Sequence, residues 1–302
     1  MEISMSFQII SDSSCDLPQD IINSKQIHVV PFYLSFDGEN YKKEGVEIEV
    51  REFYQNMVDQ PGVYPKTSMP STQDYIDVFE LYAKQGIPMI CICISTKFSG
   101  SYNSAMTAKE MVLEDYKDAQ IAVIDATVNT VLQGLLVLEL VKMKENSYTF
   151  SQSVEAIETL KTTGRIIFTI GSVDYLKNGG RIGKVMGIAA GVLKIRPLIL
   201  LKEGEIFPLG IARKREKSKQ MVLEQVKKYF ADSGENPEDY EICVGYGYDK
   251  EEGEAFAKEF EESLAQYSSK REIKVYQIGA AIGVHTGPEP IGVAFIKKYD
   301  KQ

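Results

Sequence analysis

Short apolar segments alternate with amphipathic ones along the first half of the chain. Residues 87–94 and 121–125 are continuous apolar runs bounded by turn residues, a pattern typical of strands that are buried on both faces. Two further strands are predicted at residues 6–10 and 27–34. The predicted helices are residues 70–85, 100–115 and 129–144. This alternation predicts a parallel sheet with helices on both faces.

The second half has a different pattern. Residues 196–201 and 205–211 are apolar and flank Lys202-Glu203-Gly204, which predicts a hairpin with a glycine-containing turn. Other predicted elements are strands at 165–170, 240–244, 273–278 and 291–296, and amphipathic helices at 216–230 and 251–267. Two helices against a mixed sheet indicate an α+β domain. The polar region at 147–163 predicts the boundary, with domains at 1–160 and 161–302.

Composition and charge narrow the class of protein. The 302 residues carry 34 Lys and Arg against 43 Asp and Glu, and this net charge of −9 disfavours tracking of nucleic-acid phosphates. No apolar stretch approaches the roughly 20 residues of a membrane span. The N-terminus, Met1-Glu2-Ile3-Ser4, has neither the basic nor the apolar region of a signal peptide. We therefore expect a cytoplasmic globular protein.

The cysteines indicate packing rather than chemistry. Cys91 and Cys93 stand in an apolar run, where a thiol behaves as a small hydrophobic side chain. A metal site would need a second pair of ligands at suitable spacing, and His28 and His285 are the only histidines. We expect no disulfide and no metal.

The common enzyme fingerprints are missing from the sequence. The segment starting at Gly245 and Gly247 lacks the third glycine of a dinucleotide-binding loop. Gly183-Lys184 lacks the flanking residues of a phosphate-binding P-loop, and no G-x-S-x-G elbow occurs. Conventional nucleotide or hydrolase chemistry is not recognisable here.

Two segments combine small hydroxyl residues with predicted helix starts, at residues 66–71 and 95–102. A helix start offers unpaired N–H groups and a positive dipole end, so two that converge could hold a carboxylate or phosphate. Taken singly, Ser and Thr at such positions are ordinary helix caps. A third segment, residues 282–288, places His285 among glycines and apolar residues, where a histidine is most often a core or turn residue.

Taken together and in order, five motifs resemble the DegV family, and the resemblance covers nearly the whole chain. The motifs are Ser11-Asp12-Ser13, Lys66-Thr67-Ser68-Met69-Pro70-Ser71, Phe98-Ser99-Gly100-Ser101-Tyr102, Tyr175-Leu176-Lys177-Asn178-Gly179-Gly180-Arg181-Ile182 and His285-Thr286-Gly287-Pro288. Members of this family are bacterial fatty-acid-binding proteins, the lipid-carrying subunits of fatty acid kinase. The resemblance implies an N-terminal three-layer α/β/α domain with a parallel sheet and a C-terminal α/β domain with a mixed sheet.

The resemblance also implies a site. The fatty acid would lie in an apolar tunnel, its carboxylate held by Thr67 and Ser99 with the Gly100 amide as a further donor and His285 nearby. Arg181 would serve docking or activity with the kinase subunit. So would an arginine of the basic stretch, which the resemblance places at Arg213, with Arg215 as the alternative. The chain is then expected to supply the substrate, to need no cofactor and to catalyse no reaction itself.

Several positions depart from the family pattern. Met69 stands where many relatives have Gln, Glu289 where they have Gly, and Ser101 where Thr is more usual. The basic stretch at 213–219 could be a solvated helix start or an electrostatic dock for an acidic partner. These departures bear on partner choice and acyl preference more than on lipid binding.

The leading hypothesis is therefore a protein that binds a long-chain fatty acid and presents it to a separate kinase. An alternative is a stand-alone lipid esterase with Ser99 as nucleophile and His285 as base, although no third orienting residue is apparent. A DNA-associated regulator is a third possibility, which the net charge of −9 opposes.

Overall fold

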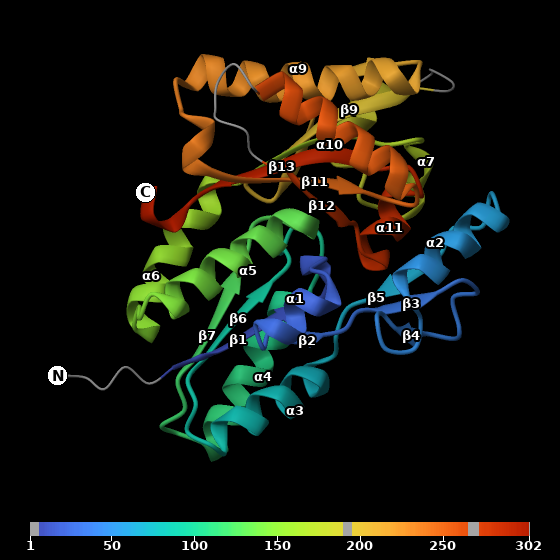
Figure 1. Cartoon of the computed structure of the whole chain (residues 1–302). Helices are drawn as coiled ribbons and strands as arrows, with labels where there is room; N and C mark the ends of the chain where they lie inside the picture. The colour runs from blue at the N-terminus through green and yellow to red at the C-terminus, as the bar shows by residue number, and fades with distance from the viewer. Residues whose placement is uncertain (1–5, 190–194, 265–271, 302) are drawn as a thin grey trace.

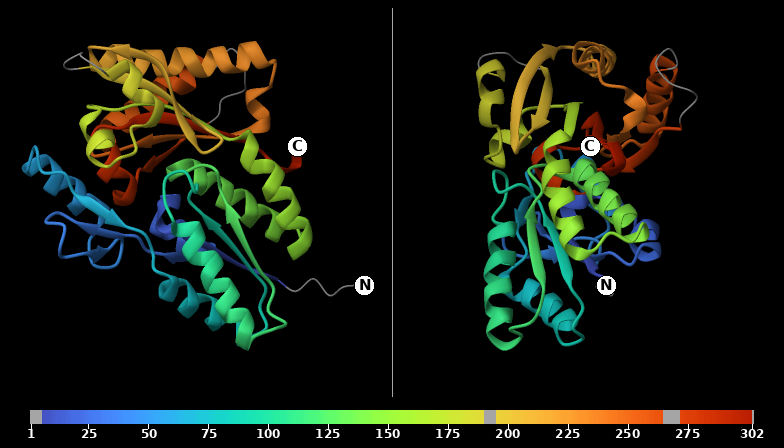
Figure 2. Two further views of the ribbon diagram at one scale, coloured as in Figure 1. Left: turned by 180° about the vertical axis from the view of Figure 1, so that it is seen from behind. Right: turned by 90° about the vertical axis from the view of Figure 1, so that its left-hand side faces the viewer.

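Two β-sheets lie one above the other with helix α5 (Thr130–Glu145) between them (Figure 1). This is a computed structural model, which describes residues 6–189, 195–264 and 272–301. The views in Figure 2 show further helices on the outer side of each sheet. The layers therefore run helices, sheet, helix α5, sheet, helices.

The N-terminal sheet is parallel, with strand order β2-β1-β6-β7. Its strands are β1 (Gln8–Asp12), β2 (His28–Val30), β6 (Met89–Cys93) and β7 (Ile121–Asp125). Helices α3 (Thr72–Ala83) and α4 (Ser101–Asp115) cover one face, where Tyr75, Phe79 and Ala108 pack on Ile10 and Cys91. Helix α5 covers the other face, so the predicted parallel sheet with helices on both faces is confirmed.

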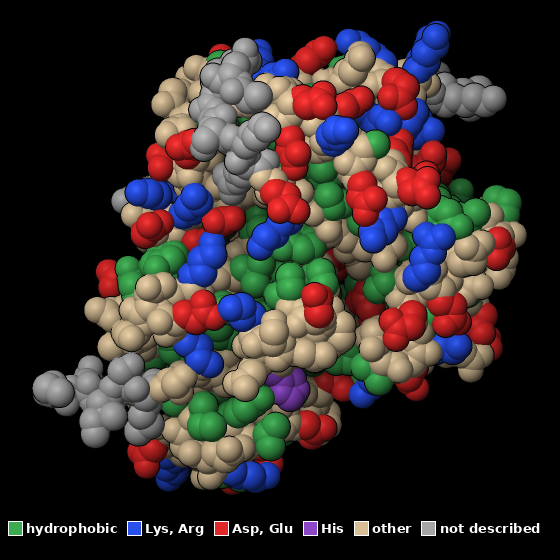
Figure 3. All heavy atoms as spheres, viewed as in Figure 1, with side chains coloured by type: hydrophobic (Ala, Val, Ile, Leu, Met, Phe, Trp, Pro, Cys, Tyr) green, Lys and Arg blue, Asp and Glu red, His purple; other side chains and the backbone are tan. Residues whose placement is uncertain are grey.

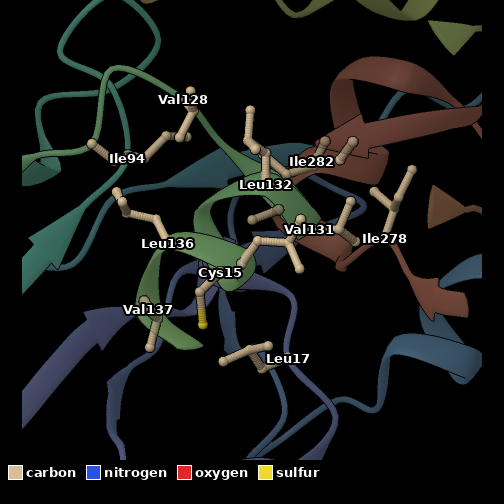
Figure 4. Packing of buried hydrophobic residues seen from close by; sticks show 14 of the residues in the cluster. Cys15, Leu17, Ile94, Val128, Val131, Leu132, Leu136, Val137, Ile278 and Ile282 are labelled. Atoms are coloured by element: carbon tan, nitrogen blue, oxygen red, sulfur yellow. The ribbon is translucent and has the colours of Figure 1, made fainter. Parts of the chain in front are cut away.

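Helix α5 is apolar on all sides, which is expected of a helix enclosed by protein. Twelve of its sixteen residues are buried. Val131, Leu132 and Leu136 join one hydrophobic cluster with Cys15 and Ile278, which come from opposite ends of the chain (Figure 4). The burial of this one helix thus ties the two sheets together.

The C-terminal sheet is mixed, with strand order β10-β9-β8-β13-β11-β12. All pairs are antiparallel except β11 with β12. Its strands are β8 (Arg165–Thr169), β9 (Arg196–Lys202), β10 (Glu205–Ala212), β11 (Tyr240–Tyr246), β12 (Lys274–Gln277) and β13 (Ile291–Lys297). Helices α9 (Arg215–Ser233) and α10 (Lys250–Leu264) cover its outer face. The predicted α/β class, the mixed sheet and the hairpin of β9 and β10 are confirmed.

The structure corrects several local predictions. Residues 27–34 form two strands rather than one: Pro31 has no N–H to donate, and β3 (Tyr33–Ser35) turns away into a small antiparallel sheet. The other strands of that sheet are β4 (Lys42–Lys43) and β5 (Lys66–Ser68). The polar region at 147–163 contains helix α6 (Phe150–Leu160), which starts with a capping box of Thr149 and Gln152. The division into domains at residue 160 stays a prediction, and residues 265–267 of the predicted helix at 251–267 lie outside the described residues.

The remaining helices are short. They are α1 (Gln19–Ser24), α2 (Val50–Asp59), α7 (Asp174–Asn178), α8 (Met186–Ala189) and α11 (Ala280–Thr286). Single 3-10 turns are η1 (Ser13–Cys15), η2 (Lys161–Thr163), η3 (Gly183–Val185), η4 (Pro237–Asp239) and η5 (Tyr299–Lys301). Among them, α11 matters most here, because Ala281, Ile282, His285 and Thr286 of this helix line the cavity described below.

The surface carries both signs of charge, and the cysteines lie in the interior. Acidic and basic side chains are interspersed over the face seen in Figure 3. All four cysteines are buried as thiols. Within the described ranges, no helix is both long and apolar enough to cross a membrane.

A buried carboxylate joins the elements at the carboxyl edge of the parallel sheet. Asp12, at the end of β1, is fully buried. Its Oδ1 accepts hydrogen bonds from Ser14 Oγ (2.6 Å) and Gln133 Nε2 (2.8 Å), and its Oδ2 accepts from Ile94 N (2.9 Å) and Ser101 Oγ (2.7 Å). Burial raises the pKa of Asp12, while these hydrogen bonds oppose that rise. Asp12 therefore connects β1 to the end of β6, the start of α4 and helix α5.

We expect Asp12→Ala to lower the free energy of unfolding by about 3 kcal/mol, because it leaves several buried donors without an acceptor. Asp12→Asn keeps the shape and should cost less. The exposed Asp59→Ala, on α2, is the control and should change stability by less than about 0.5 kcal/mol. Urea unfolding measures all three variants, and equal stabilities of Asp12→Ala and the control would contradict this role.

Candidate functional site

A cavity of about 310 Å³ lies between the two sheets. Its walls are mostly apolar and come from both halves of the chain, and this volume is at the lower end of ordinary ligand sites. The apolar side chains that line it include Phe32, Ile94, Val131, Ile166, Phe168, Leu176, Leu201, Ile206, Ile278 and Ile282. Such a cavity suits a ligand with a substantial hydrocarbon part.

The polar groups of the cavity are the residues singled out from the sequence. Thr67, Ser99, Gly100, Arg181 and His285 all line it. They come from β5, the loop after β6, the loop after α7 and helix α11. The fold thus brings to one place five residues spread over more than two thirds of the chain.

Ser99 and Gly100 lie where β6 gives way to α4. Gly100 is the residue before the first turn of α4, and Ser99 Oγ accepts a hydrogen bond from Ser101 N (3.2 Å). The fifteen-residue helix α4 therefore directs its positive end toward the cavity. The side chain of Met69 lies across Gly100, since a Cβ on Gly100 would stand 2.7 Å from the Met69 sulfur. Met69 is 43% exposed and so forms part of the cavity wall that borders solvent.

The second predicted helix start does not contribute as expected. Thr67 lies on strand β5, paired with Leu34 of β3, and not at a helix start. Ser71 does cap helix α3, but its hydroxyl is engaged with Asp74 in a capping box and is not among the residues that line the cavity. The start of α3 therefore does not join the start of α4 at the cavity. Thr67 reaches the cavity from a strand instead.

His285 contacts Thr67 in the wall of the cavity. Its Nε2 lies 3.4 Å from Thr67 Oγ1, and among the described residues its buried Nδ1 has no hydrogen-bond partner. Burial, with the nearby positive charge of Arg181, lowers the pKa of His285 to about 4, so the ring is neutral at neutral pH. A neutral ring that donates from Nε2 to Thr67 leaves the threonine hydroxyl free to donate to a ligand.

Two buried carboxylates hold the helix that carries His285. Glu44 Oε1 accepts a hydrogen bond from Ala281 N (3.0 Å), in the first turn of α11, and Glu44 Oε2 accepts from Ser13 Oγ. Asp16 approaches the same turn so closely that a Cβ on Gly279 would lie 2.2 Å from its Oδ1. Burial raises the pKa of both carboxyl groups. The first turn of α11 is thus held by Glu44, a side chain distant in sequence.

The two arginines of the docking prediction occupy different places. The Arg181 guanidinium donates to the carbonyl oxygens of Phe98 (3.1 and 3.0 Å) and Gly179 (2.7 Å), so it connects the loop after β6 to the C-terminal half. Arg213 is exposed and does not line the cavity. Arg215 is paired with Glu252. A docking role for either arginine of the basic stretch stays a prediction.

Two glycines in the cavity wall were not predicted as site residues. Gly245 on β11 and Gly292 on β13 are direct register partners, and both line the cavity. A Cβ on Gly292 would lie 2.4 Å from the Cβ of Phe168, so this glycine serves close strand packing. A Cβ on Gly245 would meet Val131 at 3.1 Å and Ile278 at 3.4 Å, contacts that small shifts could relieve. A glycine inside the predicted strand at 291–296 is the signal that could have marked Gly292, whereas Gly245 falls just beyond the predicted strand at 240–244.

The neutral state of His285 predicts a pH-dependent stability. In the folded protein its pKa is about 4, whereas the unfolded chain has the ordinary value of 6.5. The unfolded state therefore binds the proton first, and the contribution of His285 to stability is lost as pH falls from about 6.5 toward 4. As the pH falls from about 6.5 to 4, the free energy of unfolding measured in urea should decrease more for the wild type than for His285→Gln. Parallel curves for the two proteins would contradict the assignment.

Comparison with known proteins identifies the family. The model of the DegV family, described as uncharacterised proteins, matches residues 6–298. A DegV domain-containing protein of Caldanaerobacter subterraneus is 32% identical over 96% of this chain and 98% of its own. One from Clostridium perfringens is 30% identical over 96% and 97%.

Solved structures agree with this match. A stearic acid-binding protein from Eubacterium ventriosum is 47% identical, with a TM-score of 0.93 over 98% of this chain and 100% of that chain. A fatty acid-binding DegV family protein from Thermus thermophilus is 27% identical, with a TM-score of 0.83 over 97% and 100%. The chain therefore belongs to the DegV family.

Proposed function

We propose that this protein binds a long-chain fatty acid in the cavity and presents its carboxylate to a separate fatty acid kinase. The observation that carries the proposal is an apolar cavity whose polar end is formed by Thr67, Ser99 and a neutral His285. The similar proteins from E. ventriosum and T. thermophilus bind stearic acid and a fatty acid, respectively, and this supports the ligand class. The proposed setting is the cytoplasm, and no cofactor is part of the proposal.

The hydrocarbon chain supplies most of the affinity. Each buried methylene contributes about 0.8 kcal/mol, so binding tightens about fourfold for every methylene that the cavity accommodates. The head group then needs only enough donors to replace its water. The hydroxyls of Thr67 and Ser99 and the N–H groups at the start of α4 provide such donors.

Neutral donors also suit a carboxylate that must react. A bidentate arginine clamp would hold the carboxylate oxygens tightly and reduce their nucleophilicity. Arg181 lines the cavity, but three of its five N–H groups are already donated to backbone carbonyls. The head group is thus oriented without a strong ion pair.

The proposed reaction takes place on the partner enzyme. A carboxylate oxygen bonds to the γ-phosphorus of ATP, the bond from that phosphorus to the bridging oxygen breaks, and ADP leaves with that electron pair. The products are an acyl phosphate and ADP, and no proton is gained or lost. The present chain contributes the positioned substrate.

The esterase alternative finds no specific support. A nucleophilic serine needs a hydrogen-bonded base. The hydrogen bond that the structure gives to Ser99 Oγ comes from Ser101 N, and His285 Nε2 faces Thr67 instead. We therefore retain the binding function alone.

Removing both head-group hydroxyls tests the carboxylate site. Thr67→Ala with Ser99→Ala should weaken hexadecanoate binding at least about tenfold and abolish its phosphorylation by a fatty acid kinase and ATP, because two donors to a charged group are lost. Isothermal titration and ATP consumption are the measurements. Thr159→Ala with Ser263→Ala, outside the cavity, is the matched control. Full transfer by the double variant with a normal urea midpoint would contradict the site.

Filling the space above Gly245 tests where the acyl chain lies. We expect Gly245→Ala, Gly245→Val and Gly245→Leu to reduce stepwise the length of the longest acid that still gains affinity. Their side chains would press on Val131 and Ile278, which line the cavity together with Gly245. Titration with straight-chain acids from decanoic to octadecanoic gives this limit. The exposed Gly187→Leu, where a Cβ meets nothing within 4 Å, is the control. An unchanged length profile in all three variants would exclude this wall of the cavity from the acyl path.

A further inference from the structure

A charged groove adjoins the polar end of the cavity. We call it the head-group groove; it measures about 500 Å³ and is formed by residues 96–100, 180, 181, 183, 184 and 204–206. Five residues line both the groove and the cavity: Phe98, Ser99, Gly100, Arg181 and Ile206. Anything that grows outward from a carboxylate at Ser99 would therefore enter this groove.

The groove is positive in a protein that is negative overall. Its charged residues are Lys97, Arg181, Lys184 and Glu205, which is three cations against one carboxylate and a net charge of +2. Arg181 keeps two N–H groups that are not donated to the carbonyls of Phe98 and Gly179. A site of this size and charge suits a dianion.

Backbone geometry opens the groove and places its lysines. Gly180, Gly183 and Gly204 have φ values of +68°, +46° and +79°, so the chain turns there without side chains that would fill the space. A Cβ on Gly204 would stand 3.1 Å from the Cγ of Lys97, which shows that the stem of this lysine lies across the turn between β9 and β10. The groove is thus built from both halves of the chain.

The carboxylate of Glu205 currently occupies part of this positive field. It is paired with Lys184, and that bond together with the charges of Lys184 and Lys97 holds the pKa of Glu205 below its usual range. Both side chains of the pair are well exposed, at 56% and 40%, and exposed ion pairs of this kind are weak. Lys184 can therefore exchange Glu205 for a more highly charged ligand.

We propose that the head-group groove binds the phosphoryl group of an acyl phosphate formed on the bound fatty acid, with Lys97 and Lys184 as its principal ligands. This inference rests on the proposed function. Phosphorylation changes the head group from a monoanion to a bulkier dianion. The neutral donors of the cavity suit the carboxylate monoanion, and the cations of the groove suit the phosphoryl dianion. The groove would thus retain the activated product after ADP has left.

The test uses the non-hydrolysable β-keto phosphonate analogue of hexadecanoyl phosphate, with hexadecanoate as the companion ligand. Lys97→Gln with Lys184→Gln should weaken analogue binding at least about tenfold and leave hexadecanoate binding within about twofold. Glu205→Gln should strengthen analogue binding, because it removes the competing carboxylate. The control, Lys228→Gln with Lys258→Gln, makes the same change of charge at exposed positions outside the groove.

The outcomes separate this inference from the function on which it rests. Equal losses of analogue affinity in the groove variant and the control would indicate a general effect of charge and overturn the proposal. Unchanged analogue binding in the groove variant would also overturn the proposal. If that variant bound the analogue normally but slowed phosphoryl transfer by the kinase, the groove would instead contact an acidic segment of that enzyme. If the wild type binds neither ligand, the proposed function itself is wrong. Selective loss for the analogue, reversed in sign by Glu205→Gln, supports the groove.

Discussion

A carboxylate that is removed from water must be met by hydrogen-bond donors, and this constraint organises the site of the protein. Asp12 is completely buried and is satisfied by groups from the end of β6, the start of α4 and helix α5. The loop that carries Ser99 and Gly100 lies between two of these groups, Ile94 and Ser101. Its conformation is therefore set by a buried carboxyl group that does not itself line the cavity.

The same constraint acts a second time at α11. Glu44, in the N-terminal half, accepts a hydrogen bond from the first turn of a short helix of the C-terminal half, and the buried Asp16 lies beside that turn. That helix ends near His285, which faces Thr67. Buried acids thus position the donors on both sides of the cavity, while the donors themselves stay neutral. Of the three cations of the groove, Arg181 also lines the cavity, whereas Lys97 and Lys184 line the groove alone.

The sequence predicted the elements whose patterns are decided locally. The apolar runs of β6 and β7 and the all-round apolar helix α5 were predicted close to their observed bounds. The resemblance named Thr67, Ser99, Gly100, Arg181 and His285, and all five line one cavity. Their roles as ligands remain predictions.

Other features depend on contacts that no local pattern contains. Helix α11 was not predicted, because the side chain that accepts from its first turn is Glu44, more than two hundred residues away. The split of residues 27–34 follows from the pairing of β3 with β5. The need for a glycine at position 245 comes from the close approach of Val131, on α5, and Ile278 to β11, and a single chain segment carries no sign of that approach.

The central claim is that the cavity holds a fatty acid, and native mass spectrometry of the purified protein tests it most directly. The account predicts a mass above that of the chain by one fatty acid, which is released on denaturation and identified after organic extraction. A mass equal to that of the bare chain, with no uptake of added hexadecanoate or oleate, would contradict the account.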